Sequence, residues 1–427
     1  MNSSATVTRF HFGPSEPVDS CAHHIPSLYR RDVPGFGGSA PVRFDAGKLL
    51  RVHGDAISRT VTDLFTTLST IYCVDKWAPR ETSADDGWTR HLVLDIAVSD
   101  PDPWNATPVN KTLSTLVRFL SSDRWELRFH RAPEPPAPLH PALFSHHRAV
   151  TLFSGGLDSF GFAACREPAT HADTIYLGHQ EPRSVTGVQE RLADSLSIPD
   201  ANLAGFLFQV REFQNSGNEP TQRTRGLLFM GMGLLLASSH RIEVLTVPEN
   251  GFVALNPALT PSRPGACMTK SVHPFTLCLL NTLLTQLNVD IQVENPLESV
   301  TKGEVCRRAV EAGHSLARLA KTVSCSHSHN MQTGDFDNCG YCYPCLVRHA
   351  SLEWAGGDRT EYRYDPRRPE RFKDKEAYLA LTDWLSRDFA TTDLIGAAPL
   401  PPDADLDALT DVVLRSREEL AAAFPPR

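Results

Sequence analysis

Short apolar runs alternate with helix-like stretches along the chain after residue 145. The apolar runs predict buried β-strands, and they lie at 149–153, 174–177, 203–210, 242–247 and 291–293. Between them, apolar residues recur every three or four positions, which predicts helices around 158–165, 185–196, 226–239 and 274–287. This alternation predicts βαβ units, and therefore a doubly wound parallel sheet of the α/β class.

The residues before 131 have a different texture. Strand-like alternation at 92–98 and 125–131 is combined with helical spacing at 57–72 and 109–120. This pattern predicts a small N-terminal α+β domain at 1–130. Because it contains no catalytic motif, we expect it to bind a partner or to regulate the rest of the chain.

A proline-rich stretch separates these two parts of the chain. Prolines at 133, 135, 136, 138 and 141 favour extended chain and forbid a continuous helix. We therefore expect a linker at 131–145, a nucleotide-binding domain at 146–355, and a C-terminal helical extension at 356–427. A length of 427 residues is consistent with two or three domains.

The composition argues against several classes of protein. The formal charge of −8 gives no basic face, so we expect no stable complex with nucleic acid. The longest apolar run, at 226–237, is too short to span a bilayer, and the N-terminus lacks a secretory signal. We therefore expect a cytoplasmic protein without a membrane partner.

A glycine-rich turn follows the first predicted strand of the sheet. It consists of Ser154, Gly155, Gly156, Leu157, Asp158 and Ser159. Because the glycines allow close backbone approach and the turn leads into a helix N-terminus, it predicts a phosphate site. The spacing is not Gly-x-x-x-x-Gly-Lys-Ser/Thr, which excludes the loop of ATPases that cleave the terminal phosphate. The alternative is a plain Gly-Gly turn with serine as a helix cap.

Ser-Gly-Gly-x-Asp-Ser is similar to the signature of the PP-loop ATP pyrophosphatases. The resemblance implies that residues 154–159 bind ATP, which is cleaved between its α- and β-phosphates. Asp158 is placed to hold Mg²⁺ through oxygen. Lys302, which follows Thr301 and precedes Glu304 by two positions, is a candidate cation for the leaving pyrophosphate. The alternative for Lys302 is a solvated residue in a helix capping box.

Two arginines precede the predicted helix at 226–239. Guanidinium groups at a helix start suit phosphate or carboxylate binding. We therefore assign Arg223 to ATP binding and Arg225 to catalysis; a plain surface pair is the alternative.

A cysteine cluster lies near residue 340. Cys325, Cys339, Cys342 and Cys345 have spacings that suit tetrahedral Zn²⁺, and a closed set of four thiolates predicts a structural site. An iron–sulfur cluster and a redox Cys-x-x-Cys are the alternatives. His327 or His329 could also replace Cys325 as the fourth ligand.

A polar segment follows the predicted strand at 242–247, at the edge of the sheet where ligands bind. Glu249, Asn250 and Asn256 are candidates for reading the edge of a planar, purine-like base. Arg263 is a candidate for binding a carboxylate. The alternative is a hydrogen-bonded turn in which these residues serve geometry.

Residues 146–355 resemble the QueC family of PP-loop enzymes. The resemblance is carried by the turn at 153–159, by Thr-Lys-Gly-Glu at 301–304 and by Cys-Gly-Tyr-Cys-Tyr-Pro-Cys-Leu-Val-Arg at 339–348. It implies a PP-loop (HUP-like) sheet and ATP- and ammonia-dependent conversion of 7-carboxy-7-deazaguanine to 7-cyano-7-deazaguanine. It also implies zinc on Cys325, Cys339, Cys342 and Cys345, with Arg348 close behind.

The chain departs from QueC in three places. QueC has no counterpart to residues 1–145, the gap between Cys325 and Cys339 is longer here, and the segment at 248–265 differs from the substrate loop of QueC. These features are similar to the longer QueC-like proteins of bacterial anti-phage operons, such as the QatC type.

The combined pattern predicts ATP-dependent activation of a carboxylate, with release of AMP and pyrophosphate. The acid would be a deazaguanine, and the attacking nitrogen would come from ammonia or from an amine on a protein partner encoded in the same operon. ATP, Mg²⁺ and Zn²⁺ are the expected cofactors. Other PP-loop chemistry, such as tRNA thiolation, and a non-catalytic ATP-binding scaffold are the alternatives.

Overall fold

The computed structural model describes residues 6–12, 23–25, 42–45, 57–132, 147–180, 183–212, 217–260, 269–327 and 337–425. Apart from residues 131 and 132, the predicted linker lies outside the described residues. Arg263 and His329 also lie outside them.

The larger sheet has the strand order β10-β9-β6-β7-β8-β3. Its strands are β3 (Val42–Asp45), β6 (Ala149–Leu152), β7 (Thr174–His179), β8 (Leu203–Val210), β9 (Val244–Thr246) and β10 (Gln292–Glu294). All neighbours are parallel except β3, which pairs antiparallel with β8. The chain runs outward from β6 to β8 on one side and returns through β9 to β10 on the other. This order confirms the predicted doubly wound α/β sheet.

A second sheet has the order β2-β1-β4-β5, and its described strand pairs are all parallel. It consists of β1 (Val7–Phe12), β2 (His23–Ile25), β4 (His91–Val98) and β5 (Arg124–Arg131).

The longer helices before residue 290 occupy the segments in which the apolar spacing predicts a helix. In the first third of the chain they are α2 (Arg59–Trp77), α3 (Arg80–Ser83), α4 (Pro101–Asn105) and α5 (Thr107–Ser121). Around the larger sheet lie α6 (Leu157–Ala164), α7 (Arg183–Ser195), α8 (Arg225–Ser239), α9 (Gly251–Leu255), α11 (Pro274–Gln286), α12 (Lys302–Glu311) and α13 (Leu316–Leu319). The last part contains α14 (Tyr343–Trp354), α15 (Glu376–Leu385), α16 (Thr391–Ala397) and α17 (Leu406–Ala423). None of the described helices combines the length and apolar character needed to cross a membrane.

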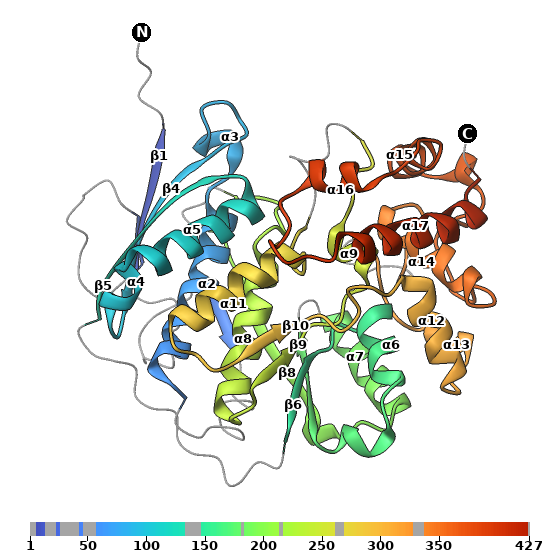
Figure 1. Cartoon of the computed structure of the whole chain (residues 1–427), viewed down its shortest axis with the longest axis horizontal. Helices are drawn as coiled ribbons and strands as arrows, with labels where there is room; N and C mark the ends of the chain where they lie inside the picture. The colour runs from blue at the N-terminus through green and yellow to red at the C-terminus, as the bar shows by residue number, and fades with distance from the viewer. Residues whose placement is uncertain are drawn as a thin grey trace.

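Alternating residues of β7 face two different cores. Ile175 and Leu177 belong to the hydrophobic cluster that includes α8 and α11, whereas Tyr176 belongs to the cluster of α6 and α7. This period of two is the expected consequence of strand geometry. Helices therefore cover both faces of the larger sheet (Figure 1).

The N-terminal part shares its core with the larger sheet. Helix α2 packs against α8, and α5 packs against α11. One cluster of buried apolar residues runs from Phe10 through Leu68 and Leu228 to Leu245. The strand β3 also contributes directly to the larger sheet. The division at residue 130 remains a prediction about domains, but the two parts are joined by a continuous hydrophobic core.

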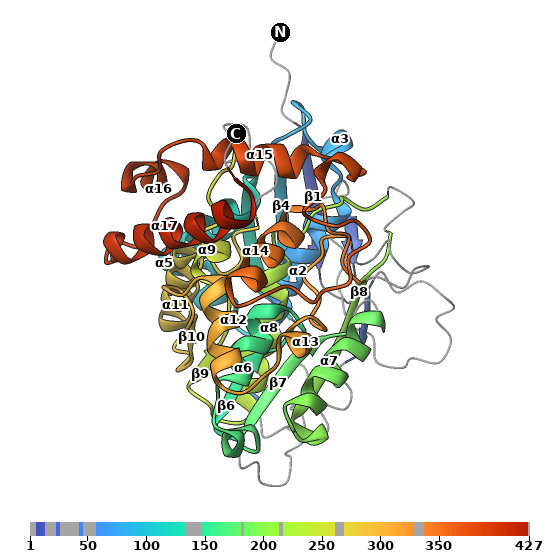
Figure 2. The same ribbon diagram turned by 90° about the vertical axis from the view of Figure 1, so that its right-hand side faces the viewer.

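The helices after residue 340 form a separate cluster beside the larger sheet, coloured orange to red in Figure 2. Their core contains residues of α14, α15 and α17, together with Phe252 of α9. This packing places α17 against α14 and α9 and also brings it to α12.

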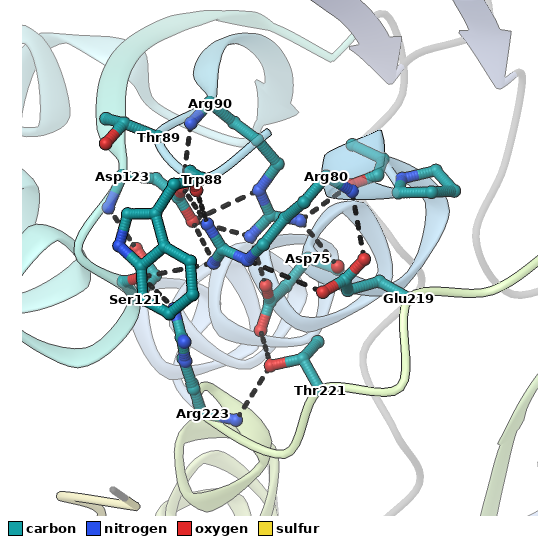
Figure 3. Close-up of polar contacts among 12 residues, drawn as sticks. Asp75, Arg80, Trp88, Thr89, Arg90, Ser121, Asp123, Glu219, Thr221 and Arg223 are labelled. Carbon is teal, nitrogen blue, oxygen red and sulfur yellow. Dashed lines mark hydrogen bonds and ion pairs between the residues drawn. The ribbon is translucent and has the colours of Figure 1, made fainter. Parts of the chain in front are cut away.

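A buried ionic network joins the N-terminal part to the segment before α8 (Figure 3). The guanidinium group of Arg90 is fully buried and lies 2.5 Å from carboxylate oxygens of both Asp75 and Asp123. Arg80 donates a second hydrogen-bond pair to Asp123, at 2.7 and 2.9 Å. The hydroxyl of Thr224 donates to Asp75 at 2.7 Å. Two cations thus face two fully buried carboxylates, and Glu219 adds a third, partly buried carboxylate 3.4 Å from Arg80. The network ties α2 to the start of α8.

We expect Arg90→Ala to lower the free energy of unfolding by about 3 to 5 kcal/mol, because it leaves Asp75 and Asp123 buried without their shared cation. The measurement is urea unfolding followed by tryptophan fluorescence and circular dichroism. Arg131→Ala is the control, because Arg131 pairs with Asp100 while its side chain is 63% exposed, and it should cost less than about 1 kcal/mol. Equal losses in the two variants would contradict a stabilising role for the network.

Candidate active site and metal centre

A cavity of about 490 Å³ opens at the carboxyl ends of the strands in the larger sheet. It lies at the switch point between β6 and β9, where doubly wound sheets bind ligands. Its polar lining includes Ser154, Ser159, His179, Gln189, Arg225 and Glu249. Its apolar lining includes Leu177, Phe206, Phe229, Met230 and Val247. The cavity therefore combines an apolar wall with a polar rim.

The glycine-rich turn forms one end of the cavity. Gly155 has a φ of +80°, a left-handed conformation that favours glycine. The carbonyl of Gly155 accepts a hydrogen bond from the N–H of Val323 at 3.0 Å. The hydroxyl oxygens of Ser154 and Ser159 lie 3.2 Å apart and both residues line the cavity. Helix α6 begins directly after the turn, so its first N–H groups are available to an anion.

Asp158 lies at the centre of a buried polar cluster beside the turn. The ammonium group of Lys302 donates a hydrogen bond to the Asp158 carboxylate and forms an ion pair with it. The amide of Asn250 lies 3.2 Å from each oxygen of the same carboxylate. Helices α6 and α12 and the segment after β9 therefore meet at one side chain.

This cluster contains more carboxyl groups than ammonium groups. Burial, followed by the negative charge of Asp158, raises the pKa of Glu249 well above its ordinary value, and Lys302 offsets part of this effect. Although burial acts to lower the pKa of Lys302, the charges of Asp158 and Glu249 outweigh it and raise that pKa. One ammonium group thus faces two carboxyl groups.

Close helix packing allows Lys302 to reach Asp158. A Cβ at Gly161 in α6 would overlap the side chain of Val305 in α12. Thr301 and Glu304 form the capping box that begins α12. The alternative to a catalytic Lys302 is a solvated lysine in a helix capping box. The capping box is present, but Lys302 is buried and paired rather than solvated.

The other predicted site residues divide between the cavity and its surroundings. Arg225 lines the cavity, with its guanidinium 3.4 Å from Nδ1 of His179. Arg223 donates to the carbonyl of Ser121 at 2.8 Å and lies over the ring of Trp88. Arg223 is not among the described residues that line this cavity, and its assignment to ATP remains a prediction.

The predicted base-reading segment is used partly within the protein. Asn250 is fully buried, and its side-chain oxygen accepts from the N–H of Val253 at 3.1 Å. Asn256 has a left-handed backbone that ends α9, and its amide donates to the carbonyl of Thr269. Of these candidates, Glu249 lines the cavity.

Several polar residues of the cavity were not predicted from the sequence, His179 and Gln189 among them. His179 ends β7, and Gln189 extends from α7 beneath the turn, with its amide 3.4 Å from the carbonyls of Ser154 and His179. A histidine two residues after the predicted strand at 174–177 is a signal that could have been found. The position of Gln189 depends on how α7 packs on the sheet.

The predicted metal ligands converge beside the same cavity. The sulfur of Cys325 lies 4.0 Å from that of Cys342, and the sulfur of Cys339 lies 3.9 Å from that of Cys345. Four sulfurs around a tetrahedral Zn²⁺ at about 2.3 Å from each would be roughly 3.8 Å apart. The arrangement therefore fits a structural zinc ion.

A histidine also belongs to this cluster. Nδ1 of His327 lies 3.7 Å from the sulfur of Cys339, and His327 groups with Cys325, Cys339 and Cys342. Hydrogen bonds among the thiols lower the pKa of Cys339 and raise the pKa of Cys342 and of Cys345, so the four sulfurs titrate together as one set. Four cysteines and one histidine are thus candidates for the four ligand positions of a tetrahedral zinc ion.

The cysteine cluster contributes to the wall of the cavity. Cys325 and Ser326 line the cavity, and Val323, two residues earlier, bonds to the glycine-rich turn. Arg348 is fully buried behind this segment and donates to the carbonyls of Leu319 and Ala320. A zinc ion bound here would fix one wall of the cavity.

Two comparisons with known proteins agree with this geometry. Residues 270–356 match a family described as "Queuosine biosynthesis protein QueC". The chain is also 26% identical over 246 residues to the 7-cyano-7-deazaguanine synthase of Pyrococcus abyssi (strain GE5 / Orsay). This match covers 52% of this chain and 99% of the relative. The two matches support a QueC-like family. The matched segment contains Lys302 and all four candidate cysteines.

We expect Cys345→Ala to lose bound zinc, because it removes one of four thiolates, whereas His327→Ala should keep one zinc ion per chain. The measurement is metal content by mass spectrometry after gel filtration. Cys165→Ala is the control, because Cys165 is exposed and lies on the end of α6. Zinc retained in Cys345→Ala and lost in His327→Ala would instead make His327 the fourth ligand.

Proposed function

We propose that this protein uses ATP to activate the carboxylate of 7-carboxy-7-deazaguanine and then transfers the acyl group to a nitrogen nucleophile. The observation that carries the proposal is the meeting of Asp158, Lys302 and Asn250 beside the serine-containing turn. The name of the Pyrococcus relative supports a deazaguanine as the acid.

ATP would bind with its phosphates at the turn and at the start of α6. The hydroxyls of Ser154 and Ser159 and the first N–H groups of the helix would face the phosphate oxygens. Asp158, with Glu249 beside it, offers the oxygen ligands that Mg²⁺ prefers. A divalent cation there would neutralise phosphate charge, and it would also balance the second carboxyl group.

The first reaction would be adenylation of the acid. A carboxylate oxygen attacks the α-phosphorus, the bond to the β-phosphate oxygen breaks, and pyrophosphate leaves with the electron pair. Lys302 and Arg225 would stabilise the charge that develops on the phosphates. The apolar wall formed by Phe206 and Phe229 would pack against a flat ring, with Glu249 at its polar edge.

The second reaction would transfer the acyl group to nitrogen. The nucleophile attacks the acyl carbon, and AMP leaves with its oxygen. With ammonia the product is an amide, which a second ATP would allow to be dehydrated to a nitrile. With a protein amine the product is a modified partner.

A protein amine is the acceptor that we propose for this chain, in a bacterial anti-phage context. The Pyrococcus relative is aligned over almost its whole length but covers only about half of this chain. The additional N-terminal sheet shares a continuous hydrophobic core with the rest of the chain, so it would offer a partner a fixed surface.

We expect purified protein to release pyrophosphate from ATP when 7-carboxy-7-deazaguanine is present, measured with a coupled pyrophosphate assay. Asp158→Asn should lower kcat at least about a hundredfold because it weakens a ligand of the proposed Mg²⁺. Lys302→Ala should have an effect of the same size because it removes a cation beside the phosphates. Lys321→Ala, an exposed lysine outside the cavity, is the control. ATP binding without turnover would instead favour a scaffold, and release that required tRNA would favour thiolation.

Intact-mass spectrometry of proteins co-expressed from the same operon tests the acceptor. One partner should gain the mass of a deazaguanine acyl group, and this gain should vanish with Asp158→Asn. Unmodified partners together with efficient formation of the free nitrile would reject transfer to protein.

A further inference from the structure

The C-terminal helix α17 places a carboxyl group behind the catalytic lysine. Glu419 is 4% exposed, although it lies on a helix at the periphery of the chain. We propose that Glu419 is a positioning residue for Lys302, so that α17 forms part of the nucleotide-binding machinery. This inference rests on the proposed function insofar as Lys302 acts on ATP.

Glu419 contacts the residues on both sides of Lys302. The hydroxyl of Thr301 donates a hydrogen bond to one carboxylate oxygen, and the N–H of Gly303 donates to the other at 3.0 Å. Thr301 is the N-cap of α12, and its hydroxyl also accepts from the N–H of Glu304 at 3.0 Å. Glu419 therefore satisfies a backbone N–H that the first turn of a helix leaves without an internal partner.

The sequence of α12 makes room for this carboxyl group. A Cβ at Gly303 would lie 2.6 Å from the carboxylate atoms of Glu419, which is too close for any other residue type without movement. One turn earlier on α17, Arg415 pairs with Glu304 and donates to the carbonyl of Ser299 at 2.8 Å. Helix α17 thus holds the start of α12 at two levels.

Stability alone does not explain the buried carboxyl group of Glu419. Burial raises the pKa of Glu419 to about 7, against the opposing effect of hydrogen bonds from Thr301 and Gly303. A buried carboxyl group whose neighbouring arginine is engaged elsewhere is less stabilising than an apolar side chain of similar size. A buried carboxyl group at this position is explained if it fixes the geometry of the residue between its two partners.

The geometry places Lys302 between two fixed points. Its backbone is held from the α17 side, whereas its ammonium group extends to Asp158 near the cavity. Displacements of about 1 Å in a catalytic group can cost two orders of magnitude in rate. The family match covers residues 270–356, so Glu419 lies outside the matched segment.

The test compares Glu419→Ala and Glu419→Gln with Glu418→Ala, an exposed neighbour on the same helix. ATP affinity is measured by calorimetry, and kcat by pyrophosphate release. We expect Glu419→Ala to weaken both by about tenfold or more. Glu419→Gln should be less affected because its oxygen can still accept one hydrogen bond, and Glu418→Ala should match wild type. Wild-type values in both Glu419 variants would overturn the inference.

A double-mutant cycle separates positioning from general destabilisation. If Glu419 acts through Lys302, Glu419→Ala should change ATP affinity less than about twofold in the Lys302→Ala background. Independent, additive losses would overturn the inference while leaving the proposed function intact. A wild-type protein that does not bind ATP would instead reject the proposed function. Thermal unfolding checks that each variant folds. If Glu419→Ala does not fold, the same double-mutant cycle is measured with the near-isosteric Glu419→Gln.

Discussion

The buried ion pair between Lys302 and Asp158 is the interaction on which the rest of the site depends. It joins two helices that start at the same edge of the sheet but lie 144 residues apart in the chain. Its environment leaves an excess of carboxyl groups, because Glu249 lies beside the pair. A site of this kind is poised for a cation and for the anionic ligand that would accompany it.

Three supports hold this pair in place from different parts of the chain. The absence of a side chain at Gly161 allows α6 to approach α12. Glu419 fixes the start of α12 from behind. The cysteine cluster and the Val323 contact with Gly155 fix the glycine-rich turn. The cavity is thus built by helix packing and by the cysteine cluster together, which explains why its walls come from distant segments.

The N-terminal part is linked to the cavity by ion pairs and hydrogen bonds at the start of α8. Its ionic network around Arg90 and Asp123 holds the segment that begins α8, where Arg225 faces the cavity. Arg223, two residues earlier, contacts Ser121 and Trp88 of the N-terminal part. The two arginines therefore connect the additional sheet with the active site from neighbouring positions.

The sequence by itself determined the α/β class, most strands, the longer helices before residue 287, the glycine-rich turn and the four cysteines, because these follow from periodicity and from spacing within short segments. It did not reveal the edge strand β3, whose four residues acquire strand character only by pairing with β8. Only the tertiary structure placed Gln189 beneath the turn, turned Arg223 toward Trp88 and engaged Asn250 with Asp158. It also brought Glu419 to Thr301, 118 residues away. Contacts between distant segments depend on how helices pack on the sheet, and no local pattern in the chain encodes that packing.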